Sequence, residues 1–284
     1  MTTAAHQAPS AAWGRAFGTA RLGGFLEGRP GDRPPLVLLH GLTFDHGMWR
    51  PAVDALRGRD PGRQVLVLDL PGHGDSPMLP ACDPEDVAAA VASAVDDAGL
   101  DSPVMVGHSI AAVIASVYAG TYPTRGVVNV DQPLDTSFVR LLQANREVIT
   151  GPGFSQLWPA ILASMRIDVL PENAQRLLST ELPRQDVVLA YWRQGLELSL
   201  ADLEARVAEG LAMLRRQQLP YLIIAGHEWD EAETRRLRKA LPQATVSVVG
   251  ANSGHFPHLA DPDRFAQLLA VTGQWRGLPQ AAPQ

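Results

Sequence analysis

Short runs of apolar residues, rich in valine, isoleucine and leucine, recur along the chain and are bounded by glycine, proline or aspartate. Runs of this length and composition predict strands that are buried on both faces of a sheet. We expect strands at residues 36–39, 65–68, 104–106, 127–130, 222–225 and 246–249. Helical segments separate them, one of which begins with Asp83 as N-cap and Pro84 at the first helical position. This alternation predicts an α/β fold with a mostly parallel sheet flanked by helices.

The alternation stops between Asp131 and Leu219, where the helical pattern continues without a convincing strand. Residues that break helices divide this stretch, namely Gly151, Pro152, Gly153, Pro171 and Pro183. The strand pattern then resumes at residues 220–226. We therefore predict a core made of residues 20–131 and 220–275, a helical lid at 132–219 inserted into it, and flexible ends at 1–19 and 276–284.

Composition and charge exclude several classes of partner. The chain has 284 residues, 46% of them hydrophobic, which is enough to bury a large core. Its 24 basic and 30 acidic side chains give a net charge of -6, and no lysine- or arginine-rich block indicates binding to nucleic acid or to an anionic membrane. Its single cysteine, Cys82, cannot form an intramolecular disulfide or the usual structural zinc site. We expect a monomer or homodimer that binds a small-molecule substrate.

Targeting and cofactor signals are also missing from the sequence. Residues 1–20 lack a basic start followed by an apolar stretch, which a signal peptide requires, and the longest apolar run, near 110–119, is too short to span a bilayer. Neither a phosphate-binding Gly-Lys-Ser/Thr sequence nor a metal-spaced cluster of histidine and aspartate stands out. A cytoplasmic protein without cofactor or metal is the expectation.

A serine stands at a predicted junction between strand and helix. The strand at 104–106 runs into Gly107-His108-Ser109-Ile110-Ala111, and the helix that follows is apolar on nearly every side. A serine in such a tight turn is held in a strained backbone conformation with its hydroxyl exposed, and the amides that follow favour a developing anion. The alternative is a serine that only caps the helix beginning at Ile110.

This arrangement resembles the nucleophile elbow of the α/β-hydrolases, written G-x-S-x-G, with Ala111 in place of the second glycine. Three more segments resemble that family in the expected order: His40-Gly41-Leu42, the turn Asp69-Leu70-Pro71-Gly72-His73-Gly74-Asp75-Ser76, and Ser253-Gly254-His255. The resemblance implies an α/β-hydrolase fold with a helical lid. It also implies Ser109 as nucleophile, His255 as general base, and the amides of Leu42 and Ile110 as the oxyanion hole.

The acid that orients His255 is left open by the sequence. The family commonly places it after the strand that precedes the last one, but here Trp229 occupies that spacing, with Glu228 and Asp230 on either side. Asp131 follows the strand at 127–130, where haloalkane dehalogenases and some other relatives carry the acid. We predict Asp131, with Asp230 as the first alternative and Glu228 as the second.

The predicted lid contributes aromatic and apolar side chains that are placed to line a substrate pocket: Phe138, Trp158, Tyr191 and Trp192, with Phe154 and Met165 nearby. The competing interpretation, favoured for most of them, is that they pack the lid against the core. In either case an apolar site is expected rather than one for charged sugars or phosphates.

The leading functional hypothesis is a serine hydrolase that cleaves a carboxylic ester, a lactone or a related acyl bond through an acyl-enzyme. The family also uses the same triad for carbon–carbon bond hydrolysis and for cofactor-free haloperoxidation. A second class of function is a ligand-binding, receptor-like module with little turnover. A serine at the elbow argues against epoxide hydrolases and dehalogenases, which need an aspartate there.

Overall fold

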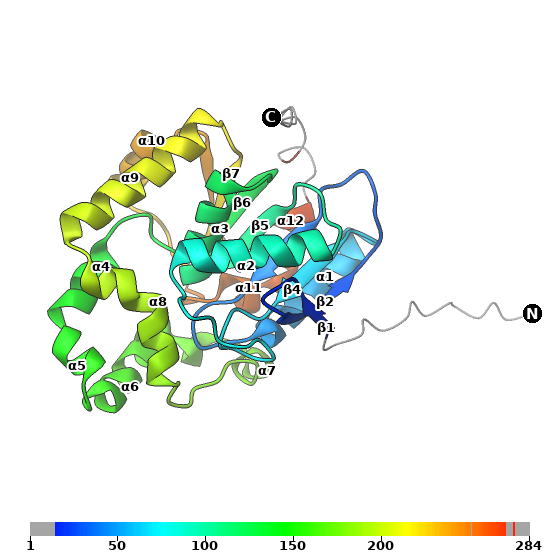
Figure 1. The fold of residues 1–284 in the computed structure, drawn as a ribbon. Helices are drawn as coiled ribbons and strands as arrows, with labels where there is room; N and C mark the ends of the chain where they lie inside the picture. The colour runs from blue at the N-terminus through cyan, green and yellow to red at the C-terminus, as the bar shows by residue number, and fades with distance from the viewer. Residues whose placement is uncertain (1–14, 251, 271–274, 276–284) are drawn as a thin grey trace, which may run out of the picture.

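A single eight-stranded sheet runs through the computed structural model, which describes residues 15–250, 252–270 and 275 (Figure 1). The strand order is β1-β2-β4-β3-β5-β6-β7-β8. Strands β1 and β2 pair antiparallel to their neighbours, whereas β3 to β8 run parallel. The strands are β1 (Arg15–Phe17), β2 (Leu22–Glu27), β3 (Leu36–Leu39), β4 (Val65–Leu68), β5 (Val104–His108), β6 (Gly126–Val130), β7 (Tyr221–Ala225) and β8 (Ala244–Val248).

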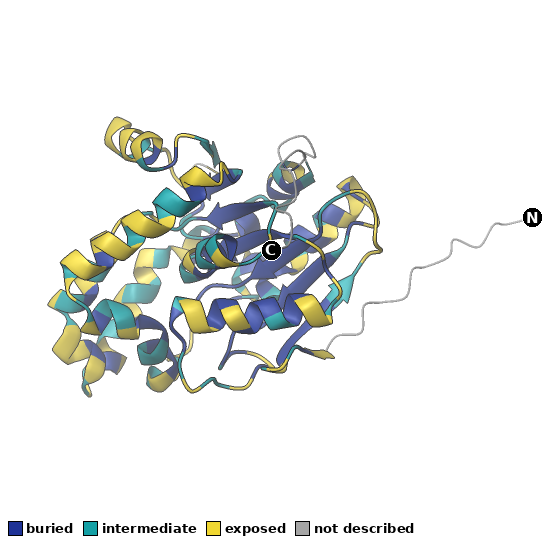
Figure 2. Ribbon diagram, turned by 45° about the horizontal axis from the view of Figure 1, so that its top comes forward, coloured by how far each residue is buried: buried dark blue, intermediate teal, exposed yellow. Residues whose placement is uncertain are grey.

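Helices cover both faces of this sheet. One hydrophobic core joins it to α2 (Pro84–Asp97), α3 (Ile110–Thr121), α9 (Leu200–Arg216) and α10 (Glu231–Ala240). A second core, on the other face, joins it to the 3-10 helix η1 (His46–Trp49) and to α1 (Arg50–Arg59), α11 (Pro257–Ala260) and α12 (Pro262–Ala270). Figure 2 shows the central strands buried and the outward sides of the helices exposed.

The sequence pattern of the central strands follows from these two cores. In β3, Val37 and Leu39 belong to the first core, while Leu36 and Leu38 belong to the second. Successive side chains of a strand point to opposite faces, and here both faces are dry. The strand therefore reads as an unbroken apolar run rather than as an alternation of apolar and polar residues.

Between β6 and β7 the described chain forms helices joined by loops, and no strand. The helices are α4 (Ser137–Ala144), α5 (Arg146–Thr150), α6 (Phe154–Met165), η2 (Ile167–Val169), α7 (Glu172–Gln175), α8 (Gln185–Glu197) and α9. Helices α4, α5, α6 and α8 form a separate lobe beside the sheet (Figure 1). The predicted lid at 132–219 falls on this segment, but its last helix, α9, packs on α3 of the core.

The predicted strands coincide with β3 to β8, with the last one beginning two residues earlier than the predicted Val246. Strands β1 and β2 were not predicted, and β1 lies inside the end expected to be flexible; residues 1–14 and 276–284 are outside the described residues. β2 contains two glycines, so it does not form the apolar run by which β3 to β8 were predicted. Gly24 is needed there because a Cβ on it would meet the Val67 carbonyl oxygen of β4 at 2.1 Å.

No helix within the described ranges is long and apolar enough to cross a membrane. In the same part of the chain, histidine, cysteine and carboxylate side chains form no group of three or more that could hold a metal ion. The cytoplasmic location expected from the sequence stays a prediction.

Candidate active site

The predicted site residues follow the carboxyl ends of the parallel strands and so meet at one edge of the sheet. Leu42 lies on the loop after β3, Ser109 follows β5, Asp131 follows β6, and His255 lies on the loop after β8. Ligands of open parallel sheets bind at this edge, because loops from several strands converge there. The fold therefore brings together residues that are far apart in the sequence.

Ser109 occupies the turn between β5 and α3 in a strained conformation, with φ 55 and ψ -131. Such a positive φ is uncommon for a residue with a side chain and often marks a functional site. The Ser109 amide donates to the Val130 carbonyl of β6 at 2.9 Å, which helps to hold the turn. Ser109 occupies the N-cap position of α3, but its side chain makes no capping hydrogen bond, so the structure gives no support to the alternative of a serine that only caps the helix.

Small residues make this turn possible. A Cβ on Gly107 would meet the Ala111 carbonyl oxygen at 2.2 Å, so only glycine fits where strand and helix pass each other. Ala111 itself is fully buried, and its methyl group is accommodated where the related motif has a second glycine. Gly41 also packs against this turn, because a Cβ there would lie 2.5 Å from His108 Nδ1 and 3.3 Å from Ser109 Cβ.

His255 is hydrogen-bonded to Asp131 through the ring nitrogen that faces away from catalysis in a triad. The distance between Nδ1 and Asp131 Oδ2 is 2.8 Å, and the other carboxylate oxygen, Oδ1, accepts the Gly226 amide at 2.9 Å. The His255 amide donates to the Met165 carbonyl at the end of α6, at 3.0 Å. His255 is thus held by the end of β6 and by a helix of the predicted lid.

Asp131 is mostly buried, and its environment favours the carboxylate. Burial alone raises the pKa of this group, but the hydrogen bond and charge of His255 and the Gly226 amide together bring the pKa below its ordinary value. A second histidine, His227, lies on the far side, with Nδ1 3.9 Å from Asp131 Oδ1. An ionised carboxylate is the form that fixes the tautomer of a neighbouring imidazole.

The two alternative acids lie elsewhere. Asp230 is the N-cap of α10 and forms a capping box with Glu233, each side chain accepting the other's backbone amide at 2.8 Å. Glu228 is exposed on the loop before it. Of the three candidates, only Asp131 has a hydrogen bond to His255 among the described residues. The sequence favoured Asp131 only through its place after a strand, because the contact itself depends on how two loops meet.

Buried histidines arrange the loop that carries Leu42. His40 Nε2 accepts the Leu70 amide at 2.8 Å, and His73 Nε2 accepts the Thr43 amide at 3.0 Å. Burial, the main cause, lowers the pKa of His40 to about 4 and that of His73 to about 3, so both rings are neutral and can accept. The Leu42 amide thus belongs to a loop that hydrogen bonds hold on both sides of it, at His40 and at Thr43.

The lid aromatics mostly pack the lid against the core or against each other. The Tyr191 hydroxyl donates to the Pro71 carbonyl at 2.9 Å, and Trp158, which is buried, lies 5.7 Å from Phe154 between ring centroids. Trp192 and the exposed Phe138 form an edge-to-face pair at 5.6 Å. A pocket role for these four residues stays a prediction.

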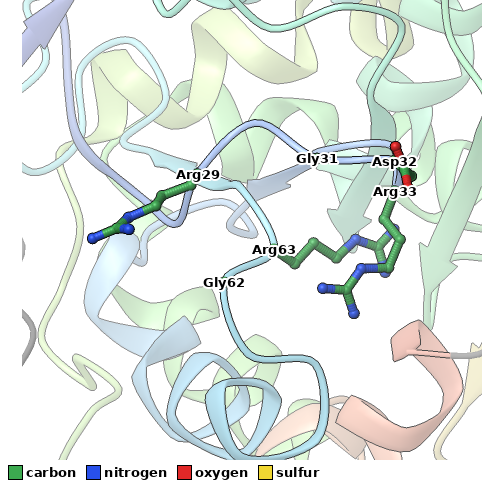
Figure 3. Close-up of a pocket in the computed structure, with 6 residues that line it drawn as sticks. All are labelled: Arg29, Gly31, Asp32, Arg33, Gly62 and Arg63. Carbon is green, nitrogen blue, oxygen red and sulfur yellow. The ribbon is translucent and has the colours of Figure 1, made fainter.

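Two cavities lie away from these aromatic side chains. One, of about 290 Å³, borders Asp131 and His255 and extends over Ile223 toward Trp229 and Leu237. The other, of about 230 Å³, lies before β3 and β4, at the opposite edge of the sheet, beside Arg29, Arg33 and Arg63. In Figure 3 the side chains of Arg33 and Arg63 lie close together while Arg29 points away. Both of the adjacent guanidinium groups contact Asp60, which makes this a structural ion-pair cluster.

Comparison with known proteins agrees with this fold. The sequence profile described as "Alpha/beta hydrolase family" matches residues 36–268. The chain belongs to this family. The predicted α/β-hydrolase fold is therefore confirmed, and the chain is a hydrolase of that fold.

Its relatives carry out different reactions. A pimeloyl-[acyl-carrier protein] methyl ester esterase of Yersinia pseudotuberculosis is 29% identical over 82% of this chain and 91% of the relative. A 2-succinyl-6-hydroxy-2,4-cyclohexadiene-1-carboxylate synthase of Serratia proteamaculans is 25% identical over 84% of this chain and 92% of the relative. The crystal structure of haloalkane dehalogenase DbeA from Bradyrhizobium elkani shares the fold, with a TM-score of 0.67 and 19% identity over 92% of this chain and 96% of that one.

Proposed function

We propose that this α/β hydrolase cleaves a carboxylic ester, a lactone or a related acyl bond of a small, largely apolar substrate. Ser109 is the nucleophile in this proposal, His255 the general base and Asp131 the acid that orients it. The observation that carries the proposal is the 2.8 Å hydrogen bond from His255 Nδ1 to Asp131, on the loops that flank the strained turn at Ser109. Esterase names among the relatives support the same reaction class.

The reaction begins at the Ser109 hydroxyl. Asp131 accepts a hydrogen bond from Nδ1–H of His255, so the free electron pair of the neutral ring lies on Nε2. That nitrogen takes the hydroxyl proton as Oγ attacks the carbonyl carbon, and it then gives the proton to the leaving alkoxide. Water repeats the sequence on the acyl-enzyme and releases the carboxylic acid.

The negative charge that develops on the carbonyl oxygen is assigned to two backbone amides. Ile110 supplies one at the start of α3, where the helix dipole also favours an anion. Leu42 supplies the other from the loop that His40 and His73 hold in place. Fixed amides aimed at a developing oxyanion are worth several kcal/mol in acyl transfer, on the order of 3 kcal/mol each.

A substrate panel tests the proposal. p-Nitrophenyl esters of increasing acyl length, simple methyl esters and lactones are assayed with the wild type, with Ser109→Ala and with Ser116→Ala as a matched control. Ser116 lies further along α3, and its hydroxyl bonds to Ala112 and Tyr221 instead. We expect turnover of at least one acyl class that disappears in Ser109→Ala and persists in Ser116→Ala. Full activity in Ser109→Ala would overturn the proposal.

A further inference from the structure

The residue before the proposed nucleophile makes a contact that joins two distant loops. His108, the last residue of β5, places its Nε2 2.7 Å from the main-chain carbonyl oxygen of His255, a residue 147 positions away. The ring of His108 is fully buried, and its centroid lies 4.6 Å from that of the His255 ring. This short contact joins the segment that carries Ser109 to the segment that carries His255.

The protonation state of His108 follows from its surroundings. Burial, and then the neighbouring histidines, hold the pKa of His108 well below its ordinary value, so the ring is neutral and carries one N–H. A carbonyl oxygen can only accept, so that N–H is on Nε2 and points at His255. Nδ1 lies instead on the side of Gly41, where a Cβ would be 2.5 Å away.

The other contacts that hold the His255 loop come from different parts of the chain. Its ring is bonded to Asp131 after β6, and its amide is bonded to Met165 at the end of α6. Among the described hydrogen bonds of His255, only the one from His108 comes from β5, the strand that leads into Ser109. Without it, the hydrogen-bonded link between His255 and the Ser109 turn in the described chain runs only through β6, by the bond of Asp131 to His255 and that of the Ser109 amide to Val130.

We propose that His108 is a positioning residue, whose Nε2–H fixes the His255 loop relative to Ser109 while its ring supports the Gly41 turn. This inference rests on the proposed function of Ser109 and His255. It assigns no proton transfer to His108. A misplacement of about 1 Å in a catalytic group can cost about 100-fold in rate, so a loss of this link is measurable.

Variants at one position separate the hydrogen bond from the packing of the ring. His108→Met fills the space without a donor, whereas His108→Gln carries an amide N–H at the same ε position. His258→Met is the matched control. His258 is as buried as His108, and the centroids of the two rings are 5.0 Å apart. Neither ring nitrogen of His258 has a hydrogen-bond partner among the described residues. Each variant is assayed for kcat, KM and the free energy of unfolding.

We expect His108→Met to lower kcat by about 10- to 100-fold with KM little changed, since substrate binding is not affected. His108→Gln should recover most of that loss, and His258→Met should keep kcat within about threefold of the wild type while also losing stability. If His108→Met does not fold, His108→Asn takes its place, because its amide ends at the δ position and is too short to reach His255.

Equal kcat in the wild type and His108→Met would overturn the inference, as would equal losses in the Met and Gln variants. The rate at which a fluorophosphonate labels Ser109 is measured in parallel. If the wild type is not labelled, the proposed function fails. If the wild type and His108→Met are labelled at the same rate, only the positioning role fails.

Discussion

Replacement of Asp131 by asparagine exchanges one carboxylate oxygen of the proposed triad for an NH₂ group. The carboxylate accepts two hydrogen bonds, from His255 Nδ1 at 2.8 Å and from the Gly226 amide at 2.9 Å. An asparagine oxygen can accept only one of the two while its NH₂ group occupies the other place. If the oxygen stays with Gly226, the NH₂ faces Nδ1 and forces the ring proton onto Nε2, which can then no longer accept from Ser109.

The expected loss follows from that change of tautomer and from the missing charge. In a serine protease triad, the same substitution lowers kcat by about 10⁴-fold while the geometry stays intact. A loss of about 10³- to 10⁴-fold corresponds to about 4 to 5.5 kcal/mol of transition-state stabilisation, at about 1.4 kcal/mol per factor of ten. We expect Asp131→Asn to fall in this range.

The assay is steady-state hydrolysis of the best p-nitrophenyl ester, with circular dichroism and urea unfolding to confirm that each variant folds. Asp230→Asn is the matched control, because asparagine caps a helix about as well as aspartate and α10 should be unaffected. Its kcat should stay within about twofold of the wild type. The reasoning is refuted if Asp131→Asn keeps more than about a tenth of the wild-type kcat, or if Asp230→Asn shows the larger loss.

Other substitutions test the elbow, the lid and a buried histidine. Gly107→Ala should lower kcat at least about tenfold, since its Cβ would meet the Ala111 carbonyl at 2.2 Å; unchanged kinetics would refute the tight turn. Tyr191→Phe should lower the free energy of unfolding by about 1 kcal/mol in urea titrations, because the hydroxyl donates to Pro71, with kcat unaffected. Burial lowers the pKa of His258 from 6.5 to about 3, so its unfolded form binds a proton below pH 6.5 that the folded form does not. The stability that neutral His258 contributes is therefore present above pH 6.5 and is lost on acidification. Between about pH 8 and pH 5 the free energy of unfolding of the wild type should fall by about 2 kcal/mol more than that of His258→Met. Parallel curves of unfolding free energy against pH for the two proteins would contradict this.

Much of the core was predictable because its strands carry a strong local signal. Residues 36–39 and 65–68 are apolar throughout, since both faces of β3 and β4 are covered by helices. β2 gave no such signal: Gly24 is required by the close approach of β4, and Gly23 by that of Asp75, and both requirements are visible only once the chain is folded. Antiparallel edge pairing is therefore harder to predict than the parallel centre of this sheet.

The candidate site divides in the same way. The turn at Ser109 and the Gly254-His255 pair carry short-range signals, because tight turns restrict which residues fit. The choice among Asp131, Asp230 and Glu228 carries a weaker signal, since all three lie between Ser109 and His255 in the chain and only their spacing from the preceding strands separates them. The contact from His108 to the His255 carbonyl was not predicted either, because a main-chain acceptor leaves no mark on the sequence.

Covalent trapping tests the central claim, that Ser109 is the nucleophile. The wild type is treated with a fluorophosphonate, digested and mapped by mass spectrometry, with Ser109→Ala treated in the same way. The account predicts one phosphonyl adduct, on the peptide that contains Ser109, together with loss of ester hydrolysis, and no adduct in the variant. An ester-hydrolysing wild type that is unmodified at Ser109, or that is modified and inactivated at another residue, would contradict it.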